Sequence, residues 1–231
     1  MSLPTTPHTA PADTSAPAKT WNWIPIRSLG PRHRERIAQH LHALGENDRY
    51  LRFGYAATDA QISKYVDMLD FEQDEVFGIF NRKLVLIAMA HLAHSIPGPN
   101  ATDPPMSEFG VSVLTQARGR GFGARLFEHA MLHARNRGVR TLFIHALSEN
   151  VAMLKIARNA GATIERSGSE SDARVVLPPD TIASHVDELV EHQAAELDYQ
   201  LKVKARQAAD LLDTIAEVKE SVGRSSRVAQ G

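Results

Sequence analysis

The sequence predicts a mixed α/β fold: a mostly antiparallel sheet of about seven strands with flanking helices, followed by a C-terminal helical extension. Between residues 21 and 179, strand-like and helix-like segments follow the order β-α-α-β-β-β-α-β-α-β-β. Only residues 107–147 require a parallel crossover, because the other connections suit hairpins. Beyond residue 180 the pattern changes to a long run of helical spacing. We therefore expect an α/β domain at 21–179 and a helical extension at 180–222.

The composition is ordinary for a globular protein and excludes several classes of function. Hydrophobic residues make up 43% and charged residues 23% of the 231 residues, and the net charge of −1 gives no electrostatic case for nucleic-acid binding. The chain has no cysteine, which excludes disulfides, thiolate nucleophiles and cysteine-bound metals. The N-terminus lacks the features of a secretory signal, and the longest apolar run, residues 84–90, is too short for a bilayer. We expect a cytoplasmic protein with no membrane partner.

The N-terminal part predicts a tail, one strand and two helices. Residues 1–20 carry too few large apolar side chains to fold, so we expect a disordered tail. Residues 21–28 are typical of a strand, and Pro25 favours a sheet edge because it donates no ladder hydrogen bond. A helix is expected from Pro31 to Gly45, and a second short helix at 61–69.

The middle of the chain predicts a hairpin, a loop and another strand. Residues 75–81 and 83–94 are strand-like and separated by a short polar break. The second run is apolar on both faces, which favours a central strand. The proline-rich residues 95–106 are expected to form a loop, and residues 107–115 the next strand.

The rest of the domain predicts two more helices and three more strands. Gly138 and Gly161 each follow a helical pattern and indicate where a helix ends. The expected elements are a helix at 122–137, a strand at 141–147, a helix at 150–160, and two short strands near 163–167 and 173–177.

Apolar residues in the extension recur at steps of three, four or a multiple, which predicts a helical rod of roughly 60 Å. They are Ile182, Val186, Leu189, Leu197, Leu201, Ala205, Ala208, Leu212, Ile215 and Val222. One interpretation is a helix or helix pair that packs on its own domain, and the other is a coiled-coil arm that forms a homo-oligomer. Gln193 and Lys204 interrupt the pattern, and both interpretations stay open. Residues 223–231 are expected to form a flexible tail.

The segment VSVLTQARGRGFGARLFEHA, residues 111–130, joins a strand to a helix through three glycines on alternate positions. Glycine lets backbone approach a ligand closely and adopt a positive φ. The free N–H groups at the start of the following helix carry the positive end of its dipole. The turn therefore predicts an anion site, to which Arg118 or Arg120 adds charge.

The glycines also fit three other patterns less well. A plain strand-to-helix turn does not explain three glycines and two arginines so close together. Residues 119–124 satisfy the dinucleotide pattern G-x-G-x-x-A, but a Rossmann domain places that pattern at the front of several βαβ units. A P-loop needs Lys-Ser or Lys-Thr after the glycines, and neither follows.

Three motifs in order resemble the GCN5-related N-acetyltransferase (GNAT) superfamily. QARGRGFG at 116–123 resembles its Q/R-x-x-G-x-G/A signature. SENVAMLKIARNAGATIE at 148–165 resembles its next motif, in which Asn opens a helix that ends at Gly. DRYLRFGYAATDAQISKYVD at 48–67 resembles the start of the acetyltransferase domain in bacterial protein-lysine acetyltransferases. The resemblance covers roughly residues 20–178 and implies a GNAT-like fold with a splayed central pair of parallel strands.

The resemblance implies acetyl-CoA as the acetyl donor. Its pyrophosphate would bind the backbone amides of the glycine turn, and its pantetheine arm would pair with the preceding strand like an added strand. Asn150 would bond the pantetheine or a nearby carbonyl and also cap its helix. The implied cofactor-binding residues are Val111, Ser112, Val113, Gln116, Arg118, Gly119, Arg120, Gly121, Phe122, Gly123 and Asn150.

The resemblance also implies the groups that carry the chemistry. Glu108, on the strand before the glycines, matches the glutamate base of protein-lysine acetyltransferases, which takes a proton from the acceptor amine. His145, His94 and Glu149 are weaker candidates near the same end of the sheet. The tyrosine that many members use as an acid toward the CoA thiolate is replaced here by Ala157.

We predict an acetyl-CoA-dependent N-acetyltransferase whose leading acceptor is a protein lysine, followed by a small-molecule amine. The alternative is a non-catalytic acyl-CoA-binding module that signals through its C-terminal helices, and a dinucleotide-binding oxidoreductase is third. Tyr50, Arg52 and Phe53 either border the acceptor site or anchor a helix corner. His129 and His133 have the spacing of a metal pair, but no third ligand is apparent, so no metal is expected.

Overall fold

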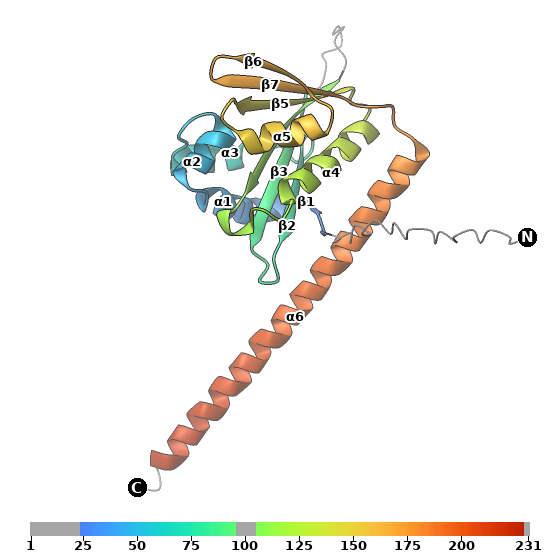
Figure 1. Cartoon of the computed structure of the whole chain (residues 1–231). Coiled ribbons are helices and arrows are strands. Elements are labelled where there is room, and N and C mark those ends of the chain that lie inside the picture. The colour runs from blue at the N-terminus through green and yellow to red at the C-terminus, as the bar shows by residue number, and fades with distance from the viewer. Residues whose placement is uncertain (1–23, 96–104, 229–231) are drawn as a thin grey trace, which may run out of the picture.

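Figure 1 shows the computed structural model of the chain, in which helices cover a sheet and one long helix extends to the C-terminus. The structure describes residues 24–95 and 105–228, with side chains described up to residue 207. The predicted tail at 1–20 and most of the predicted loop at 95–106 lie outside the described residues.

The described strands form one seven-stranded sheet in the order β1-β2-β3-β4-β5-β7-β6. Every neighbouring pair is antiparallel except β4 and β5, which run parallel. This confirms the predicted mostly antiparallel sheet with one central parallel pair. The strands are β1 Arg27–Leu29, β2 Glu75–Phe80, β3 Leu86–Ser95, β4 Met106–Val113, β5 Thr141–Leu147, β6 Thr163–Ser167 and β7 Glu170–Val176.

Six α-helices and two 3₁₀ turns accompany the strands within the described residues, and the last helix follows the last strand. The helices are α1 Arg34–His42, α2 Glu46–Phe53, α3 Asp59–Asp67, α4 Phe122–Asn136, α5 Val151–Asn159 and α6 Ile182–Val228. The 3₁₀ turns are η1 Pro31–His33 and η2 Thr115–Ala117.

Helix α2 was not predicted, because the sequence indicated one helix up to Gly45 and the next at 61–69. None of its residues, ENDRYLRF, is fully buried, and only Phe53 among them packs partly buried against the core, so the helix lacks a regular row of buried apolar residues. Glycines delimit it: Gly45 is the N-cap, and Gly54 ends the helix in the left-handed conformation with φ 79°. This helix matters because it forms one wall of the cavity described below.

Strand β1 lies at the edge of the sheet, as predicted, and pairs with β2 alone, with Arg27 opposite Gly78. It is shorter than the expected 21–28, and Pro25 precedes it. Pro25 therefore does not explain the edge position. The open side of β1 faces α6, whose Glu196 forms an ion pair with Arg27 at 2.8 Å.

Different helices cover the two faces of the sheet. On β4, Phe109 packs edge-to-face against Phe127 of α4, with ring centroids 4.9 Å apart. The next residue, Gly110, lies against the guanidinium of Arg52 from α2. Because successive strand residues face opposite sides, α4 and α2 lie on opposite faces. Side chains such as Phe77, Phe109 and Phe127 are fully buried between these layers.

The C-terminal extension is a single 47-residue helix, α6. Its first half packs in cis along the domain, where Lys202 donates to the carbonyl of Phe80 at 3.2 Å. Its second half runs past the sheet into the space beyond (Figure 1), and the helix continues through Gly223 to Val228, past the predicted end at Val222. Neither α6 nor any other described helix is apolar enough to cross a membrane.

Candidate active site

The parallel strands β4 and β5 pair only at one end and then separate. Met106, Ser107 and Glu108 pair with Thr141, Leu142 and Phe143. Past Glu108, β4 continues to pair with β3 as far as Val113, while β5 pairs with β7. The edge of β4 that faces β5 therefore has no ladder partner at Val111–Val113. Such an edge offers N–H and C=O groups to an extended ligand.

A cavity of about 570 Å³ lies along this free edge. Its walls come from α2, the end of β4, the glycine turn, the start of α4 and α5. Nine of the predicted cofactor residues line it: Val111, Ser112, Val113, Arg118, Gly119, Gly121, Phe122, Gly123 and Asn150. Gln116 and Arg120 are exposed and lie outside this lining.

The three glycines of the turn have two different roles. Gly119 and Gly121 are left-handed, with φ of 75° and 76°, and a Cβ added to either would meet nothing within 4 Å. Their outer side is therefore open to a ligand. Gly123 lies in α4, and a Cβ there would approach Ile156 of α5 at 3.3 Å, so its small size lets two helices pack closely.

The start of α4 presents free amides to the cavity. Its N-cap is Gly121, which has no side chain to accept their hydrogen bonds, and the first helical bond runs from the N–H of Arg125 to the carbonyl of Gly121. The N–H groups before it have no acceptor within the helix. This arrangement is suited to binding an anion.

Arg118 is held by an acid from the unpredicted helix α2. Its guanidinium forms an ion pair with Asp48, and its Nε donates to the carbonyl of Val113 at 3.3 Å. Both Arg118 and Asp48 line the cavity, as does Lys155 of α5. Asp48 begins the motif at 48–67, but the sequence did not predict that it pairs with Arg118, because the two residues lie far apart along the chain.

Asn150 caps α5 and connects it to α2. Its side-chain oxygen accepts from the N–H of Met153 at 3.1 Å, and its Nδ2 donates to the carbonyl of Leu51 at 3.4 Å. The capping role considered in the sequence is thus present. The residue also lines the cavity, so a ligand role is geometrically compatible.

The predicted base Glu108 lies in a second cavity, of about 550 Å³, at the point where β4 and β5 begin to separate. Its side chain is exposed. Phe143, His145 and Asp172 line the same cavity, and His145 Nδ1 lies 2.7 Å from the Asp172 carboxylate. This hydrogen bond raises the pKa of His145 above its usual value. The Asp172 carboxylate therefore favours the protonated form of the His145 ring, which disfavours His145 as the base.

The other two candidates for the base are less suited to that role. His94 also lines the second cavity, but its Nδ1 is bonded to Ser107 at 2.7 Å and its Nε2 to Glu75 at 3.2 Å. Glu149 is exposed in the turn before α5 and lines neither cavity. Glu108 is thus the carboxylate that the fold places at the split between the strands.

A comparison with models of protein families identifies the family to which this domain belongs. The profile described as the acetyltransferase (GNAT) family matches residues 47–162, half of the chain. The chain belongs to the GNAT acetyltransferase family. It is therefore an N-acyltransferase, and the family uses acetyl-CoA as acyl donor. The matched region contains Glu108, the glycine turn and Asn150, and excludes α6.

Solved structures of GNAT proteins share the fold. The GNAT domain of PAT from S. lividans is 21% identical, with a TM-score of 0.54 over 66% of this chain and 89% of that one. Ribosomal-protein-alanine N-acetyltransferase from Brucella melitensis is 17% identical, with a TM-score of 0.52 over 66% and 99%. An N-acetyltransferase from Staphylococcus aureus Mu50 is 14% identical, with a TM-score of 0.51 over 66% and 98%. A comparison with curated protein sequences finds no match.

A chain of hydrogen bonds crosses the α2 side of this GNAT domain. Arg52 donates to the Tyr65 hydroxyl at 2.9 Å, and that hydroxyl donates to His91 Nδ1 at 2.8 Å. His91 Nε2 lies 2.9 Å from the Asp74 carboxylate. Burial lowers the pKa of His91, so the neutral ring keeps its proton on Nε2, facing the carboxylate. The sequence did not predict this network of hydrogen bonds, because Tyr65, His91 and Asp74 lie in separate segments of the protein.

Tyr50, Arg52 and Phe53, which the sequence suggested for the acceptor site or a helix corner, have different positions in the structure. Arg52 lines the first cavity. Phe53 packs edge-to-face on Tyr65, with centroids 5.4 Å apart, and so anchors α2 to α3. Tyr50 lines neither of the two cavities. Phe53 therefore anchors the helix corner and Arg52 lies at the first cavity, while none of the three residues lines the second cavity with Glu108.

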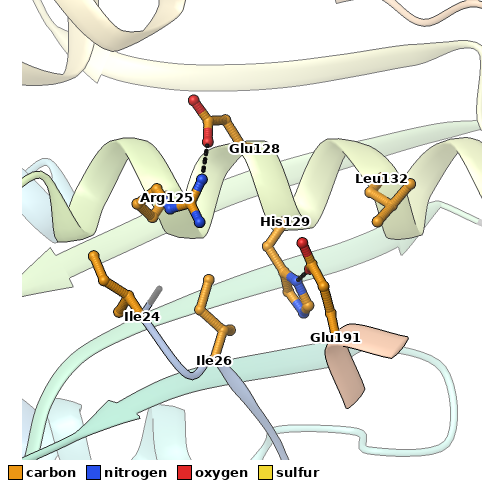
Figure 2. A pocket seen from close by; sticks show the side chains of 7 residues that line it. All are labelled: Ile24, Ile26, Arg125, Glu128, His129, Leu132 and Glu191. Carbon is orange, nitrogen blue, oxygen red and sulfur yellow. Dashed lines mark hydrogen bonds and ion pairs between the residues drawn. The ribbon is translucent and has the colours of Figure 1, made fainter. Parts of the chain in front are cut away.

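Ala157 and His129 lie apart from the chemistry of this GNAT domain. Ala157 is fully buried in α5 and supplies no acid. His129 points from α4 to Glu191 of α6 (Figure 2), with Nδ1 2.8 Å from the carboxylate. The pocket drawn there measures about 80 Å³, too small for a coenzyme. The described residues contain no group of three or more side chains arranged to hold a metal.

Proposed function

We propose that this protein is an acetyl-CoA-dependent N-acetyltransferase that transfers acetyl directly to an amine. The proposal rests on three features that follow one another along the chain. They are the free edge of β4, the left-handed glycine turn and the start of α4, which no side chain caps. Together they line one cavity. That cavity offers strand-like pairing to an extended arm and amides to an anion, which match the pantetheine arm and the pyrophosphate of coenzyme A.

The cofactor residues follow from this arrangement. The Val111–Val113 backbone pairs with the pantetheine arm, and the amides from Arg118 to Gly123 bind the pyrophosphate. Lys155 supplies positive charge nearby, and Arg118 neutralises the Asp48 carboxylate that lines the same cavity. Asn150 bonds the pantetheine while it caps α5. Gln116 and Arg120 remain proposed contacts at the outer edge of the turn.

The chemistry needs a neutral amine, an oxyanion donor and a leaving group. Acetyl-CoA supplies the acetyl group and a thiolate, which is a good leaving group. Glu108 accepts the proton of the acceptor amine, directly or through water. A backbone N–H of Val111 or Val113 stabilises the oxyanion. Since position 157 is alanine, no side chain there protonates the thiolate.

The acceptor cavity favours a cationic amine. Glu108 places an exposed carboxylate on its lining and Phe143 adds an aromatic surface, while the Asp172 carboxylate is already bonded to His145. An ammonium group is attracted to both kinds of partner. We therefore propose a protein lysine as the leading acceptor and a small-molecule amine as the next. We also propose that the chain forms a homo-oligomer through α6.

A non-catalytic acyl-CoA-binding module is the second candidate. Two observations favour it: the fully buried Ala157 in place of an acid, and the direct contacts of α6 with α4 and β1. In that case cofactor binding would be transmitted through α6 to a partner.

Glu108→Gln separates the two functions. Acetyl-CoA affinity is measured by calorimetry, and turnover is measured with lysine peptides and a panel of small amines. For an enzyme with Glu108 as base, kcat falls by about 100- to 10,000-fold while acetyl-CoA affinity stays within about twofold. Glu149→Gln is the matched control, because Glu149 is exposed outside both cavities, and it should retain full activity. Tight acetyl-CoA binding by the wild type without turnover on any amine would instead support the module.

A further inference from the structure

Two arginines line the cofactor cavity, and the protein matches the charge of only one of them. Arg118 forms an ion pair with Asp48 of α2. Arg52 lies one turn after Asp48 on the same helix, a spacing at which an acid and a base often pair. Since Asp48 bonds Arg118 instead, no carboxylate of the described residues forms an ion pair with Arg52. The cavity therefore contains a guanidinium whose charge is available to an anion.

Neutral groups hold the Arg52 guanidinium in place. Its Nη2 donates to the Tyr65 hydroxyl at 2.9 Å, and the rings of Phe53 and Tyr65 lie 5.2 and 5.6 Å from its central carbon. The Tyr65 hydroxyl is itself bonded to His91, which faces Asp74. In the part of the chain that the structure describes, Arg52 makes no other hydrogen bond. A guanidinium carries several N–H donors, so this arrangement fixes Arg52 and leaves most of its donors for a ligand.

The contact of Arg52 with β4 depends on a glycine. A Cβ added to Gly110 would lie 2.6 Å from the central carbon of the guanidinium, which is closer than two such atoms approach. The guanidinium therefore lies against the strand backbone, on the face of the sheet to which Glu108 and Ser112 also point. Glu108 comes two residues before Gly110, and Val111 comes directly after it. Arg52 thus lies between the proposed base and the start of the free edge of β4.

The free edge at Val111 is where the acyl oxygen is proposed to bind. The N–H of Leu114 donates to the carbonyl of Ile87 in β3 at 2.9 Å. Because the N–H groups of a strand alternate between its two edges, those of Val113 and Val111 point to the other edge, which β5 leaves open. Standard backbone dimensions place the Val111 nitrogen about 5 Å from the central carbon of the Arg52 guanidinium. The N–H for the acyl oxygen and the unmatched cation are therefore neighbours.

We propose that Arg52 binds a carboxylate at the far end of the acyl group, so that the donor site takes acyl-CoA molecules with a dicarboxylic chain, such as succinyl-CoA, as well as acetyl-CoA. The inference rests on the proposed acyl-CoA site. Arg52 is half-buried, so its charge is less screened than a charge in water. A guanidinium binds a carboxylate through two parallel hydrogen bonds. An acetyl group offers Arg52 no such partner, whereas a chain that is two carbons longer ends in one.

The position of Arg52 favours the donor over the acceptor as the source of the carboxylate. Arg52 lines the cofactor cavity together with Val111 and Ser112. It does not line the second cavity, in which Glu108 receives the acceptor amine. A carboxylate on the acceptor would therefore have to reach past Glu108 to meet Arg52.

The reaction with such a donor is the same acyl transfer. The amine nitrogen forms an amide bond to the acyl carbon, the carbon–sulfur bond breaks, and CoA leaves as the thiolate. The proton of the amine goes to Glu108. The distal carboxylate of the chain takes no part and stays on the product. A lysine modified in this way changes from a cation to an anion.

Calorimetry on the full chain tests the inference with three ligands: succinyl-CoA, acetyl-CoA and butyryl-CoA, which has the chain length of succinyl-CoA without the carboxylate. Wild type should bind succinyl-CoA at least about tenfold more tightly than butyryl-CoA. In Arg52→Gln this preference should fall to within about twofold, while acetyl-CoA affinity stays within about threefold of wild type. Lys155→Gln is the matched control, because it removes a charge from another wall of the same cavity. It should weaken all three ligands and keep the preference.

A second variant tests the position of the guanidinium without removing its charge. Gly110→Ala places a Cβ where the guanidinium lies, so it should also lose the preference for succinyl-CoA. Circular dichroism compares the folding of all variants with wild type. Acetyl-CoA binding without a preference for succinyl-CoA, or a preference that survives Arg52→Gln, would overturn this inference and leave the proposed function standing. Absence of binding by all three ligands would reject the acyl-CoA site itself.

The acceptor is tested separately with acetyl-CoA as donor. If Arg52→Gln raised KM for free lysine but not for a lysine inside a peptide, Arg52 would bind the carboxylate of the acceptor. That result would overturn the assignment to the donor. Equal KM values for wild type and variant on both acceptors are expected, because Arg52 lies outside the second cavity.

Discussion

At the scale of single residues, Arg118 is paired before any ligand arrives. Its guanidinium bonds Asp48, and both side chains line the cofactor cavity. The pair presents little net charge to an incoming pyrophosphate, so the backbone amides of the glycine turn provide the main attraction. Arg118 neutralises a carboxylate that would otherwise repel the ligand.

Replacing Arg118 with alanine should weaken acetyl-CoA binding by about tenfold, or about 1.4 kcal/mol, because Asp48 is then an unpaired anion beside the pyrophosphate. Adding Asp48→Asn to that variant should restore binding to within about threefold of wild type. Calorimetry measures both. Arg120→Ala is the comparison, and it should lose less because Arg120 lies outside the cavity lining. An additive loss in the double variant would contradict this role of the pair.

The protonation of buried His40, next to the cofactor cavity, makes the stability of the fold depend on pH. His40 is buried under β4, donates from Nδ1 to the Leu86 carbonyl at 2.9 Å, and accepts at Nε2 from the Ser112 hydroxyl at 2.8 Å. Burial lowers the pKa of His40 from 6.5 to about 4. Between these values the unfolded chain binds more protons than the folded chain. The stabilising effect of the neutral ring is therefore lost as pH falls from 6.5 to 4.

We expect the free energy of unfolding to fall between pH 7 and pH 4.5, with about 2–3 kcal/mol of the fall due to His40. His40→Gln should show a correspondingly smaller fall, although it is less stable at pH 7. Urea unfolding at the two pH values measures the difference. Burial also lowers the pKa of His33 to about 4, so the comparison is between variants and not with a flat profile. Equal falls in wild type and variant would contradict the assignment.

At the scale of elements, α4 offers a matched test of the glycine turn. Gly121 at its start and Gly138 just past its end have the same left-handed φ of 76°. Alanine at either position strains the backbone by about 1 kcal/mol. Gly121→Ala should weaken acetyl-CoA binding as well, whereas Gly138→Ala should lose similar stability and bind normally. Thermal unfolding and calorimetry separate the two effects, and equal binding by both variants would argue against the turn as the pyrophosphate site.

The elements also show which parts of the fold the sequence could predict. Strand β3 is a continuous apolar run and helix α4 has a regular apolar face, and these patterns predicted both elements. Helix α2 has no fully buried residue and was missed, and with it the role of Asp48. In α6 the apolar spacing was read correctly, but spacing does not say what covers a face, and residues such as Leu197 and Leu201 point away from the domain.

The candidate site also has parts that the sequence could predict and parts that it could not. The glycine turn and Asn150 were predictable because local sequence fixes a turn or a cap. The hydrogen-bond network of Arg52, Tyr65, His91 and Asp74 was not predictable, since these residues meet only after the sheet and two helices have packed. The assignment of ligand roles to the turn remains a prediction.

At the scale of the whole molecule, Tyr199 packs α6 against the domain. Its ring lies 3.7 Å from the Arg27 guanidinium carbon and packs on Phe80 with centroids 5.4 Å apart. Tyr199→Ala should destabilise the protein by about 2 kcal/mol. Acetyl-CoA affinity should stay within about twofold, because no α6 residue up to 207 lines the cofactor cavity. A large change in affinity would show that α6 and the cofactor site are coupled, and would favour the signalling module.

The central claim is that the split between β4 and β5 binds acetyl-CoA. Calorimetric titration of the full chain with acetyl-CoA tests it most directly, with NADH and NADPH as control ligands. The account predicts micromolar binding of acetyl-CoA, one molecule per chain, and no binding of either dinucleotide. Absence of acetyl-CoA binding, or binding of a dinucleotide in its place, would contradict it.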